Sequence, residues 1–257
     1  MIKLIKPNVK LLNISHENPE KFLEQCGRIC YKSENKITDD SANKFIINIM
    51  KRGHLSVIEH VSTTFKITCS RAISHELVRH RVASFSQEST RYCDYSGEVT
   101  FIIPPEFKHI PCGKYTNIIF DNNDDDIGFD LTDIDGKHKK LFTQDLYSTE
   151  FYWLHTIFNN AINYVLIIKC NGVESAREVL PNSTKTELIM TANLREWLHV
   201  IKMRYSKAAN SQVKEISGEI LDILAKKIPS IFDSEYKPLP YVNLIKNKKI
   251  EKSERLK

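Results

Sequence analysis

The hydrophobic pattern of this chain alternates between the period of a helix and that of a strand. Residues 10–14 fit a short early strand, and residues 16–31 carry apolar side chains one helical turn apart. A helix is expected from Ser41 to Gly53, where the glycine can end it. The segment 60–69 then alternates apolar and polar residues, which predicts a strand with one buried face.

The remaining pattern adds mostly helices. Residues 71–81 have helical spacing, and residues 99–103 form a strand candidate that two prolines end. A long helical pattern runs from 146 to 170 and closes at Asn171-Gly172. Further helices are expected over 186–204 and around 213–224. A few strands among several helices, without βαβ alternation, predict an α+β fold.

One segment breaks this pattern. Residues 121–136 hold seven aspartates and few apolar side chains. The ligand spacing and the closing glutamate of an EF-hand loop are missing, so we expect a solvated acidic loop insertion over about 118–140. The rest of residues 1–245 is expected to form a single α+β domain, and residues 246–257 a basic, flexible C-terminal tail.

Charge and cysteine content narrow the class of protein. The net charge is +5, but the tail 246–257 carries six basic and two acidic residues, so the remainder is nearly neutral. This balance argues against a nucleic-acid-binding surface. The six cysteines form no C-x-x-C pair, which favours reduced thiols and a cytoplasmic location. Cys26 and Cys30 lie one helical turn apart and are more typical of packing residues than of a metal site.

Neither a signal peptide nor a membrane span is expected, because no sufficiently long apolar segment occurs. The glycine-rich loops that cradle phosphates in Rossmann and P-loop proteins are also missing, and the chain has only eight glycines. A bound nucleotide would therefore be held by side chains, with arginine as the natural phosphate ligand.

Two regions concentrate such groups. In the first, Glu76, Arg79 and His80 would share one face of the helix over 71–81, followed by a polar run that ends in Arg91. In the second, Arg195 and His199 share a face opposite the apolar one of the helix predicted over 186–204. Each of these residues taken alone would be an ordinary surface or structural residue.

The order and spacing of these residues form a recognisable signature. Arg79-His80-Arg81 is followed after seven residues by Ser89, and the upstream segment 54–60 reads HLSVIEH. Further matches follow in order: Arg177, Leu180-Pro181, Asn193-x-Arg195, Arg204 and Gln212-x-x-Glu215-Ile216. This constellation resembles the flavin-dependent thymidylate synthase family over roughly residues 40–105 and 174–235.

The resemblance implies a fold, a reaction and an assembly. The fold would be α+β, with a small, mainly antiparallel sheet packed with several helices and no Rossmann unit. The reaction would convert dUMP to dTMP, with 5,10-methylenetetrahydrofolate as one-carbon donor and NADPH-reduced FAD as hydride donor. The protein would be a homotetramer whose active sites are shared between subunits, with no nucleic-acid or membrane partner and no metal.

The resemblance also implies roles for individual residues. Arg204 would polarise a carbonyl of the uracil ring and is the expected catalytic residue. Positions matched to FAD contacts are His54, Ser56, Glu59, Arg79, His80, Arg81, Val82, Gln87, Asn193, Arg195 and His199. Positions matched to dUMP contacts are Glu76, Arg79, Gln87, Glu88, Ser89, Thr90, Arg91, Arg177 and Arg204. Three of the matched positions depart from the family's usual residue, since threonine is usual at position 56, glutamine is frequent at position 76 and asparagine is commoner at position 199.

Alternative functions rest on subsets of the same residues. The arginines of 79–91 and the basic tail could belong to a nucleic-acid-binding module. His54, His60 and His80 with the aspartates could belong to a metal-dependent phosphohydrolase, although their spacings fit no metal motif. Ser89 could be read as a nucleophile, but it has no obvious base beside it in the sequence.

Overall fold

The computed structural model describes residues 1–120, 127–142 and 148–233, which form two compact units. Unit 1 consists of residues 1–8, 68–79 and 86–188, and unit 2 of residues 9–67, 80–85 and those from 189 onward. The predicted basic tail and residues 121–126, which hold four of the seven aspartates, lie outside the described residues. The single catalytic domain expected over residues 1–245 stays a prediction.

Unit 1 contains a five-stranded sheet with the order β5-β1-β6-β7-β8. Its strands are β1 (Ile2–Ile5), β5 (Val99–Ile102), β6 (Gly113–Phe120), β7 (Ile127–Asp133) and β8 (His138–Phe142). The short strand β1 has no counterpart in the predicted elements. It pairs parallel with β5 and antiparallel with β6, and the other described pairs are antiparallel. The mixed α+β class with mostly antiparallel pairing is therefore confirmed, although two sheets are present instead of one.

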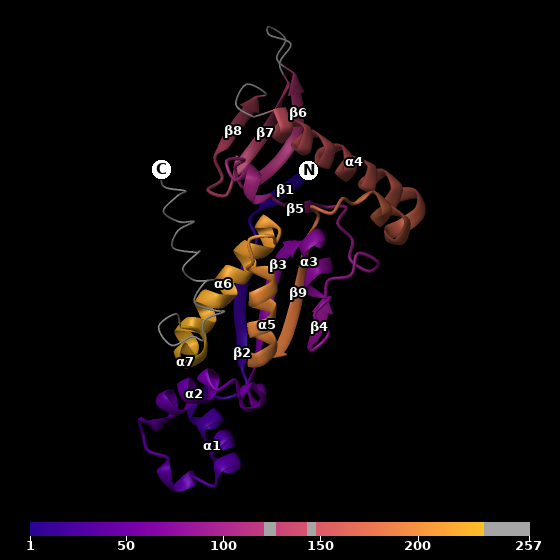
Figure 1. The fold of residues 1–257 in the computed structure, drawn as a ribbon. Helices are drawn as coiled ribbons and strands as arrows, with labels where there is room; N and C mark the ends of the chain where they lie inside the picture. Colours follow the sequence, from indigo (N-terminus) through magenta and orange to yellow (C-terminus); the bar gives the residue numbers. More distant parts are fainter. Residues whose placement is uncertain (121–126, 143–147, 234–257) are drawn as a thin grey trace. The chain divides into compact units, whose positions relative to one another are not determined.

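Helix α4 (Ser148–Ala176) covers this sheet (Figure 1). Leu154, Ile157 and Phe158 of α4 are buried in the same cluster as Tyr115 and Phe129 of the sheet. Gly172 interrupts the helix with φ 77°, a backbone conformation that glycine adopts without steric cost. The end predicted at Asn171-Gly172 is therefore confirmed as a break, after which one more helical turn follows.

The loop predicted over about 118–140 is wrong for the residues described there, while its being an insertion stays a prediction. Ile127–Asp133 is strand β7 and pairs with both β6 and β8. The apolar residues of this segment, Phe129 and Leu131, alternate with polar ones and are fully or almost fully buried. A period of two in only seven residues was obscured by the surrounding aspartates.

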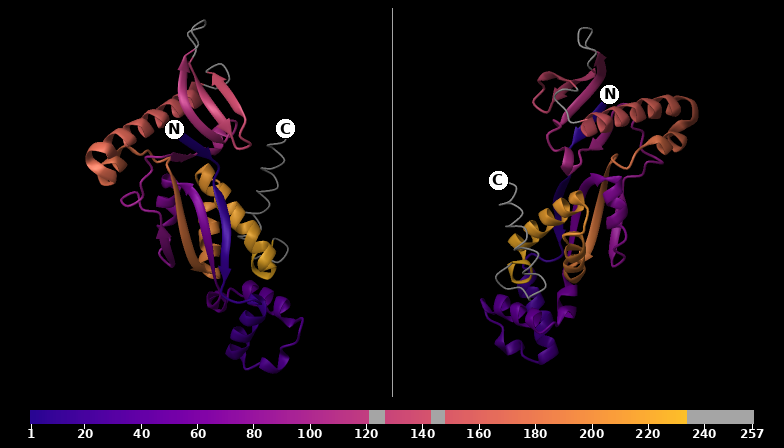
Figure 2. Two further views of the ribbon diagram at one scale, coloured as in Figure 1. Left: turned by 180° about the vertical axis from the view of Figure 1, so that it is seen from behind. Right: turned by 45° about the horizontal axis from the view of Figure 1, so that its top comes forward.

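Unit 2 holds two groups of helices. Helices α1 (Pro19–Tyr31) and α2 (Ser41–Lys51) pack on each other, and the 3₁₀ segment η2 (Leu55–His60) follows them. Helices α5 (Leu194–Arg204) and α6 (Ser211–Lys227) lie side by side, and α6 leads into α7 (Pro229–Phe232) (Figure 2). Short 3₁₀ turns elsewhere in the chain are η1 (Glu34–Lys36), η3 (Pro105–Phe107) and η5 (Arg177–Val179).

A second sheet has the order β2-β3-β9-β4, with strands β2 (Asn8–Ile14), β3 (Ser62–Ser70), β9 (Lys185–Asn193) and β4 (Ala83–Gln87). Within unit 2, α5 docks on β3 through Trp197, whose ring meets Phe65 edge-on at 5.0 Å. Trp197 Nε1 also donates to the carbonyl of Thr63 at 3.4 Å, which satisfies the polar end of a fully buried ring.

Two predicted helices are shorter than expected. The helix predicted over 186–204 is wrong in its first half, because Thr186, Leu188 and Met190 alternate into the interior as part of strand β9. Helix α3 (Arg71–Leu77) ends before Arg79, so Glu76, Arg79 and His80 do not share a helical face. None of the described helices is long and apolar enough to cross a membrane.

Candidate active site

Several side chains of the site lie at the junction where strand β9 ends and helix α5 begins. Asn193 is the N-cap of α5, and its Oδ1 accepts a hydrogen bond from the backbone N of Glu196 at 2.9 Å. The helix then buries Trp197, Leu198 and Ile201, while Arg195 and His199 stay exposed. The two faces predicted from the spacing of these residues are confirmed.

His80 lies between three polar side chains of helix α5 in unit 2. Its side chain is buried, and its Nε2 accepts a hydrogen bond from Arg204 Nε at 3.0 Å. Its Nδ1 lies 3.4 Å from Glu196 Oε1, and its ring meets that of His199 edge-on at 5.7 Å. Burial, followed by the charges of Arg204 and His199, lowers the pKa of His80 from 6.5 to about 4. The ring is therefore neutral at pH 7, with its proton on Nδ1.

A pocket of about 400 Å³ opens beside this cluster. It is lined by Glu59, Val82, Asn193, Arg195, Glu196 and His199. All of these except Glu196 are positions that the sequence matched to flavin contacts. Arg195 is ion-paired to Glu59 across 2.5 Å, with both side chains partly in solvent. The pocket thus offers a guanidinium, an amide and an imidazole together with the carboxylates of Glu59 and Glu196, a polar lining that suits a ligand with several hydrogen-bonding groups.

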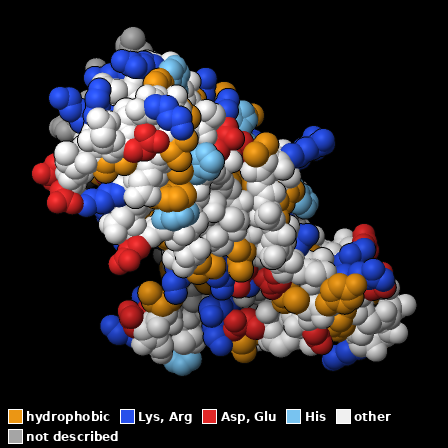
Figure 3. Space-filling view, turned by 90° about the horizontal axis from the view of Figure 1, so that it is seen from below, with side chains coloured by type: hydrophobic (Ala, Val, Ile, Leu, Met, Phe, Trp, Pro, Cys, Tyr) orange, Lys and Arg blue, Asp and Glu red, His pale blue; other side chains and the backbone are white. Residues whose placement is uncertain are grey.

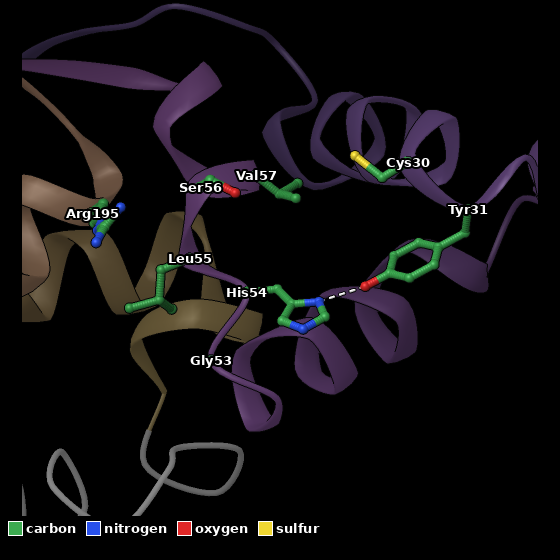
Figure 4. A pocket seen from close by; sticks show the side chains of 8 residues that line it. All are labelled: Cys30, Tyr31, Gly53, His54, Leu55, Ser56, Val57 and Arg195. Atoms are coloured by element: carbon green, nitrogen blue, oxygen red, sulfur yellow. Dashed lines mark hydrogen bonds between the residues drawn. The ribbon is translucent and has the colours of Figure 1, made fainter.

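A second pocket, of about 300 Å³, shares Arg195 with the first (Figure 4). His54 and Ser56 line it, as do Cys30 and Tyr31 at the end of α1. The hydroxyl of Tyr31 and Nδ1 of His54 are 2.5 Å apart, which holds the imidazole toward the pocket (Figure 4). The flavin-matched residues His54 and Ser56 are therefore brought together with Arg195 in unit 2.

The residues matched to dUMP mostly lie in unit 1, where strand β4 ends. Glu88 accepts hydrogen bonds from the Tyr95 hydroxyl at 2.9 Å and from Lys185 Nζ at 2.9 Å. It also accepts one from the backbone N of Glu187 at 3.1 Å. Gln87 Nε2 donates to the hydroxyls of Ser74 and Thr186, at 2.9 and 3.2 Å. These bonds fix the start of the loop against β9.

The rest of this loop leads to two arginines. Ser89 Oγ accepts from the backbone N of Arg91 at 3.2 Å, and Thr90 is 9% exposed. Ser89 thus stabilises a turn, and no base lies among the hydrogen-bond partners described for its hydroxyl. Arg91 Nε lies 3.1 Å from Glu174 Oε1 in an exposed pair, which a competing anion can replace. Arg177 Nε lies 3.3 Å from Glu178 Oε1 without hydrogen-bond geometry, and this buried nitrogen makes no hydrogen bond.

The other predicted residues follow the same division. Arg81 is exposed, as is Val82 with 65% of its surface, and both belong to unit 2. Glu76 is half-buried and Arg79 exposed, and both belong to unit 1. The flavin-matched residues thus gather in unit 2 apart from Arg79 and Gln87, and the dUMP-matched residues in unit 1 apart from Arg204.

His80, Glu196 and His199 also offer ligand atoms within 4.8 Å of one another, a spacing that could suit a metal ion. Two observations disfavour that use. Nε2 of His80 already accepts from Arg204, and the guanidinium beside the cluster repels a cation. The phosphohydrolase grouping of His54, His60 and His80 does not occur among the clusters of three potential metal ligands found in the described residues.

The model of the family described as "Thymidylate synthase complementing protein", Thy1, matches residues 10–230. The chain belongs to the Thy1 family. The flavin-dependent thymidylate synthase of Corynebacterium diphtheriae is 32% identical over 222 residues, which cover 83% of this chain and 77% of the relative. That of Mycobacterium tuberculosis H37Rv is 32% identical over 214 residues, with 82% and 77% covered.

The fold of this Thy1 chain is also similar to that of a solved structure. The UMP/dUMP methylase PolB from Streptomyces cacaoi, bound with 5-Br dUMP, aligns with a TM-score of 0.66 at 21% identity. The alignment covers 89% of this chain and 94% of the methylase. The arrangement of strands and helices described above is thus shared with that protein.

Sequence reasoning about this Thy1 chain missed Glu196 and Tyr31, and it assigned Cys30 to packing although that residue is exposed and lines the second pocket. Glu196 had a usable signal, because Asn193-x-x-Glu196 is the pattern of a capping box at a helix N-terminus. That pattern would also have placed the boundary between β9 and α5 correctly. Tyr31 had no local signal, since its contact with His54 spans 23 residues and depends on how α1 and α2 pack.

Proposed function

We propose that the chain is a flavin-dependent thymidylate synthase that converts dUMP to dTMP. The one-carbon unit would come from 5,10-methylenetetrahydrofolate and the reducing equivalents from NADPH, through FAD. The observation that carries the proposal is the pocket of unit 2, where Glu59, Asn193 and Arg195 converge with two further flavin-matched residues. Glu59 precedes Asn193 by 134 positions along the chain, yet these residues line one pocket, and the chain belongs to the Thy1 family.

The donors of this pocket fit FAD. Arg195 and His199 can bind the anionic diphosphate, and the Asn193 amide can hydrogen-bond a polar edge of the ligand. FAD, when bound there, supplies the hydride chemistry that amino-acid side chains lack. The remaining work of binding, orientation and charge stabilisation falls to the residues of this chain.

Arg204 would act on the nucleotide ring. Because His80 is neutral at pH 7, the contact with Nε2 leaves the guanidinium charge of Arg204 uncompensated by that ring. A fixed positive charge next to a uracil carbonyl stabilises negative charge that develops on the ring. The neutral imidazole holds the side chain in one direction, so little reorganisation is needed during the reaction.

The loop of residues 87–91 would bind dUMP. Gln87 and Glu88 fix the start of the loop, which leaves Arg91 at its end to reach the phosphate. Arg177, three residues after Glu174, the ion-pair partner of Arg91, would be the second phosphate ligand, with Arg79 nearby in the sequence. The unsatisfied buried Nε of Arg177 supports this role, since a phosphate oxygen would supply its missing acceptor. Glu76 would approach the pyrimidine.

The active site would be shared between subunits of a cytoplasmic homotetramer. Arg81 and Val82 support this arrangement, because they directly follow the buried His80 and yet expose their side chains. An apolar side chain that is 65% exposed beside a site is well placed to be covered by a second subunit or by the flavin.

A nucleic-acid-binding function has less support. Among the described residues of the face in Figure 3, basic and acidic side chains are interspersed. Several of the arginines matched to the site are already ion-paired to carboxylates, such as Arg195 to Glu59 and Arg91 to Glu174. Such a surface lacks the concentrated positive charge that binds a phosphate backbone.

The test is the absorbance spectrum of the purified protein together with a product assay. We expect a yellow protein with a flavin spectrum that forms dTMP only when dUMP, methylenetetrahydrofolate and NADPH are all present. A colourless protein that also fails to take up added FAD would refute the proposal.

A further inference from the structure

We propose that Glu196 is a positioning residue for Arg204 and acts through His80. The inference rests on the proposed function, in which Arg204 contacts the nucleotide. Glu196 lay outside the residues matched by sequence, and it lines the same pocket as the flavin-matched side chains.

Three polar groups form a chain of contacts in unit 2. Glu196 Oε1 lies 3.4 Å from His80 Nδ1, and His80 Nε2 accepts from Arg204 Nε at 3.0 Å. His80 and Glu196 are 4% and 9% exposed, so water has little access to the middle of this chain. The backbone of Glu196 is held in the first turn of α5, because its N donates to Oδ1 of the cap residue Asn193.

The neutral imidazole gives the series of contacts from Glu196 through His80 to Arg204 a direction. An arginine can only donate, so Nε2 of His80 must be the ring nitrogen that lacks a proton. The proton is then on Nδ1, the nitrogen that faces the Glu196 carboxylate. A carboxylate beside Nδ1 stabilises this tautomer over the alternative, in which Nε2–H would point at Arg204 Nε–H.

The other charges around His80 also favour a neutral ring that carries its proton on Nδ1. Arg204 and His199 both approach the ring, and a protonated imidazole between them would be repelled. Glu196 is the acidic group that faces Nδ1, and it stands in the same helix as both of those residues. Burial raises the pKa of Glu196, so keeping a carboxyl group at this place has a cost that a surface position would avoid. A carboxylate held there orients the ring and, through it, the guanidinium.

The experiment combines kinetics with a double-mutant cycle. Glu196→Ala should retain bound flavin and its reduction by NADPH, but lower kcat for dTMP formation by about tenfold or more. In the Arg204→Ala background, the same substitution should cause no further loss, because its effect passes through Arg204. Glu196→Gln, which keeps an oxygen acceptor, should retain most of the turnover. Lys202→Ala, at an exposed position of α5, is the matched control and should behave as wild type.

A second readout does not depend on turnover. In protein labelled with ¹⁵N-histidine, the His80 signals are identified by their loss in His80→Gln. Wild type should show the Nδ1–H tautomer, and Glu196→Ala should shift the ring toward the Nε2–H form. An unchanged tautomer in Glu196→Ala, or an equal loss of turnover with and without Arg204, would overturn the inference. A wild-type protein without flavin or dTMP formation would instead refute the proposed function.

Discussion

His80 links the protonation of the site to the stability of the fold. Its pKa of about 4 lies below the ordinary 6.5 because burial and two neighbouring positive charges disfavour the imidazolium. The unfolded chain therefore binds a proton at a higher pH than the folded one does. The neutral ring contributes stability that is fully present above about pH 6.5 and is lost as the pH falls toward 4.

This linkage predicts a pH dependence of unfolding. The free energy of unfolding of wild type should fall between pH 6.5 and about 4 more steeply than that of His80→Asn, which cannot titrate. Urea unfolding at several pH values within this window measures both slopes. Equal slopes would show that His80 titrates normally in the folded protein.

Arg204 is expected to be needed for catalysis but not for flavin binding. Arg204→Ala should keep its flavin but lose dTMP formation by about 100-fold, because it removes one group that stabilises charge in the transition state. Flavin absorbance and steady-state turnover, with Lys202→Ala as the control, separate the two effects. Unchanged turnover would remove Arg204 from the site.

The sequence predicted individual site residues more accurately than the contacts those residues make. Glu59, Asn193 and Arg195 were predicted together and line one pocket. The contact from Arg204 to His80 spans 124 residues, and no local pattern indicates it. Glu88 was expected to contact dUMP, yet both of its carboxylate oxygens already accept bonds within unit 1, which local sequence could not reveal.

At the scale of elements, the sequence predicted the long helices and missed several short strands. Helix α4 and its break at Gly172 follow from apolar spacing and a glycine. Strand β9 was read as helix because the helical spacing of α5 begins directly after it, without an intervening loop. Strand β7 was hidden by aspartates on its flanks. In both cases tertiary pairing decides the structure of a short segment.

The pairing of β6 with β7 makes a further prediction. Gly113 has φ 155°, and a Cβ at this position would lie 2.3 Å from the Thr132 carbonyl oxygen of β7. Gly113→Ala should therefore destabilise the protein by about 2 kcal/mol or more, through a clash with backbone that cannot move aside easily. Thermal unfolding compared with Gly97→Ala, where a Cβ would meet nothing within 4 Å, isolates this effect. Equal melting temperatures would contradict the register assigned to these strands.

At the scale of the whole molecule, the proposal places active sites between subunits. Co-expression of Arg195→Ala, which weakens the flavin pocket, with Arg91→Ala, which weakens nucleotide binding, then tests this arrangement. If these residues come from different chains at each site, mixed tetramers should recover up to about a quarter of wild-type dTMP formation. No recovery in tetramers shown to contain both chains would indicate that each site draws both residues from one subunit.

The proposed reaction is tested most directly by dTMP formation by the purified protein, followed together with the flavin spectrum. Under anaerobic conditions, one equivalent of NADPH should bleach the bound flavin, and the colour should return, with dTMP produced, only after dUMP and methylenetetrahydrofolate are added. A protein that binds FAD and is reduced by NADPH, yet forms no dTMP from dUMP under these conditions, would contradict the proposed reaction.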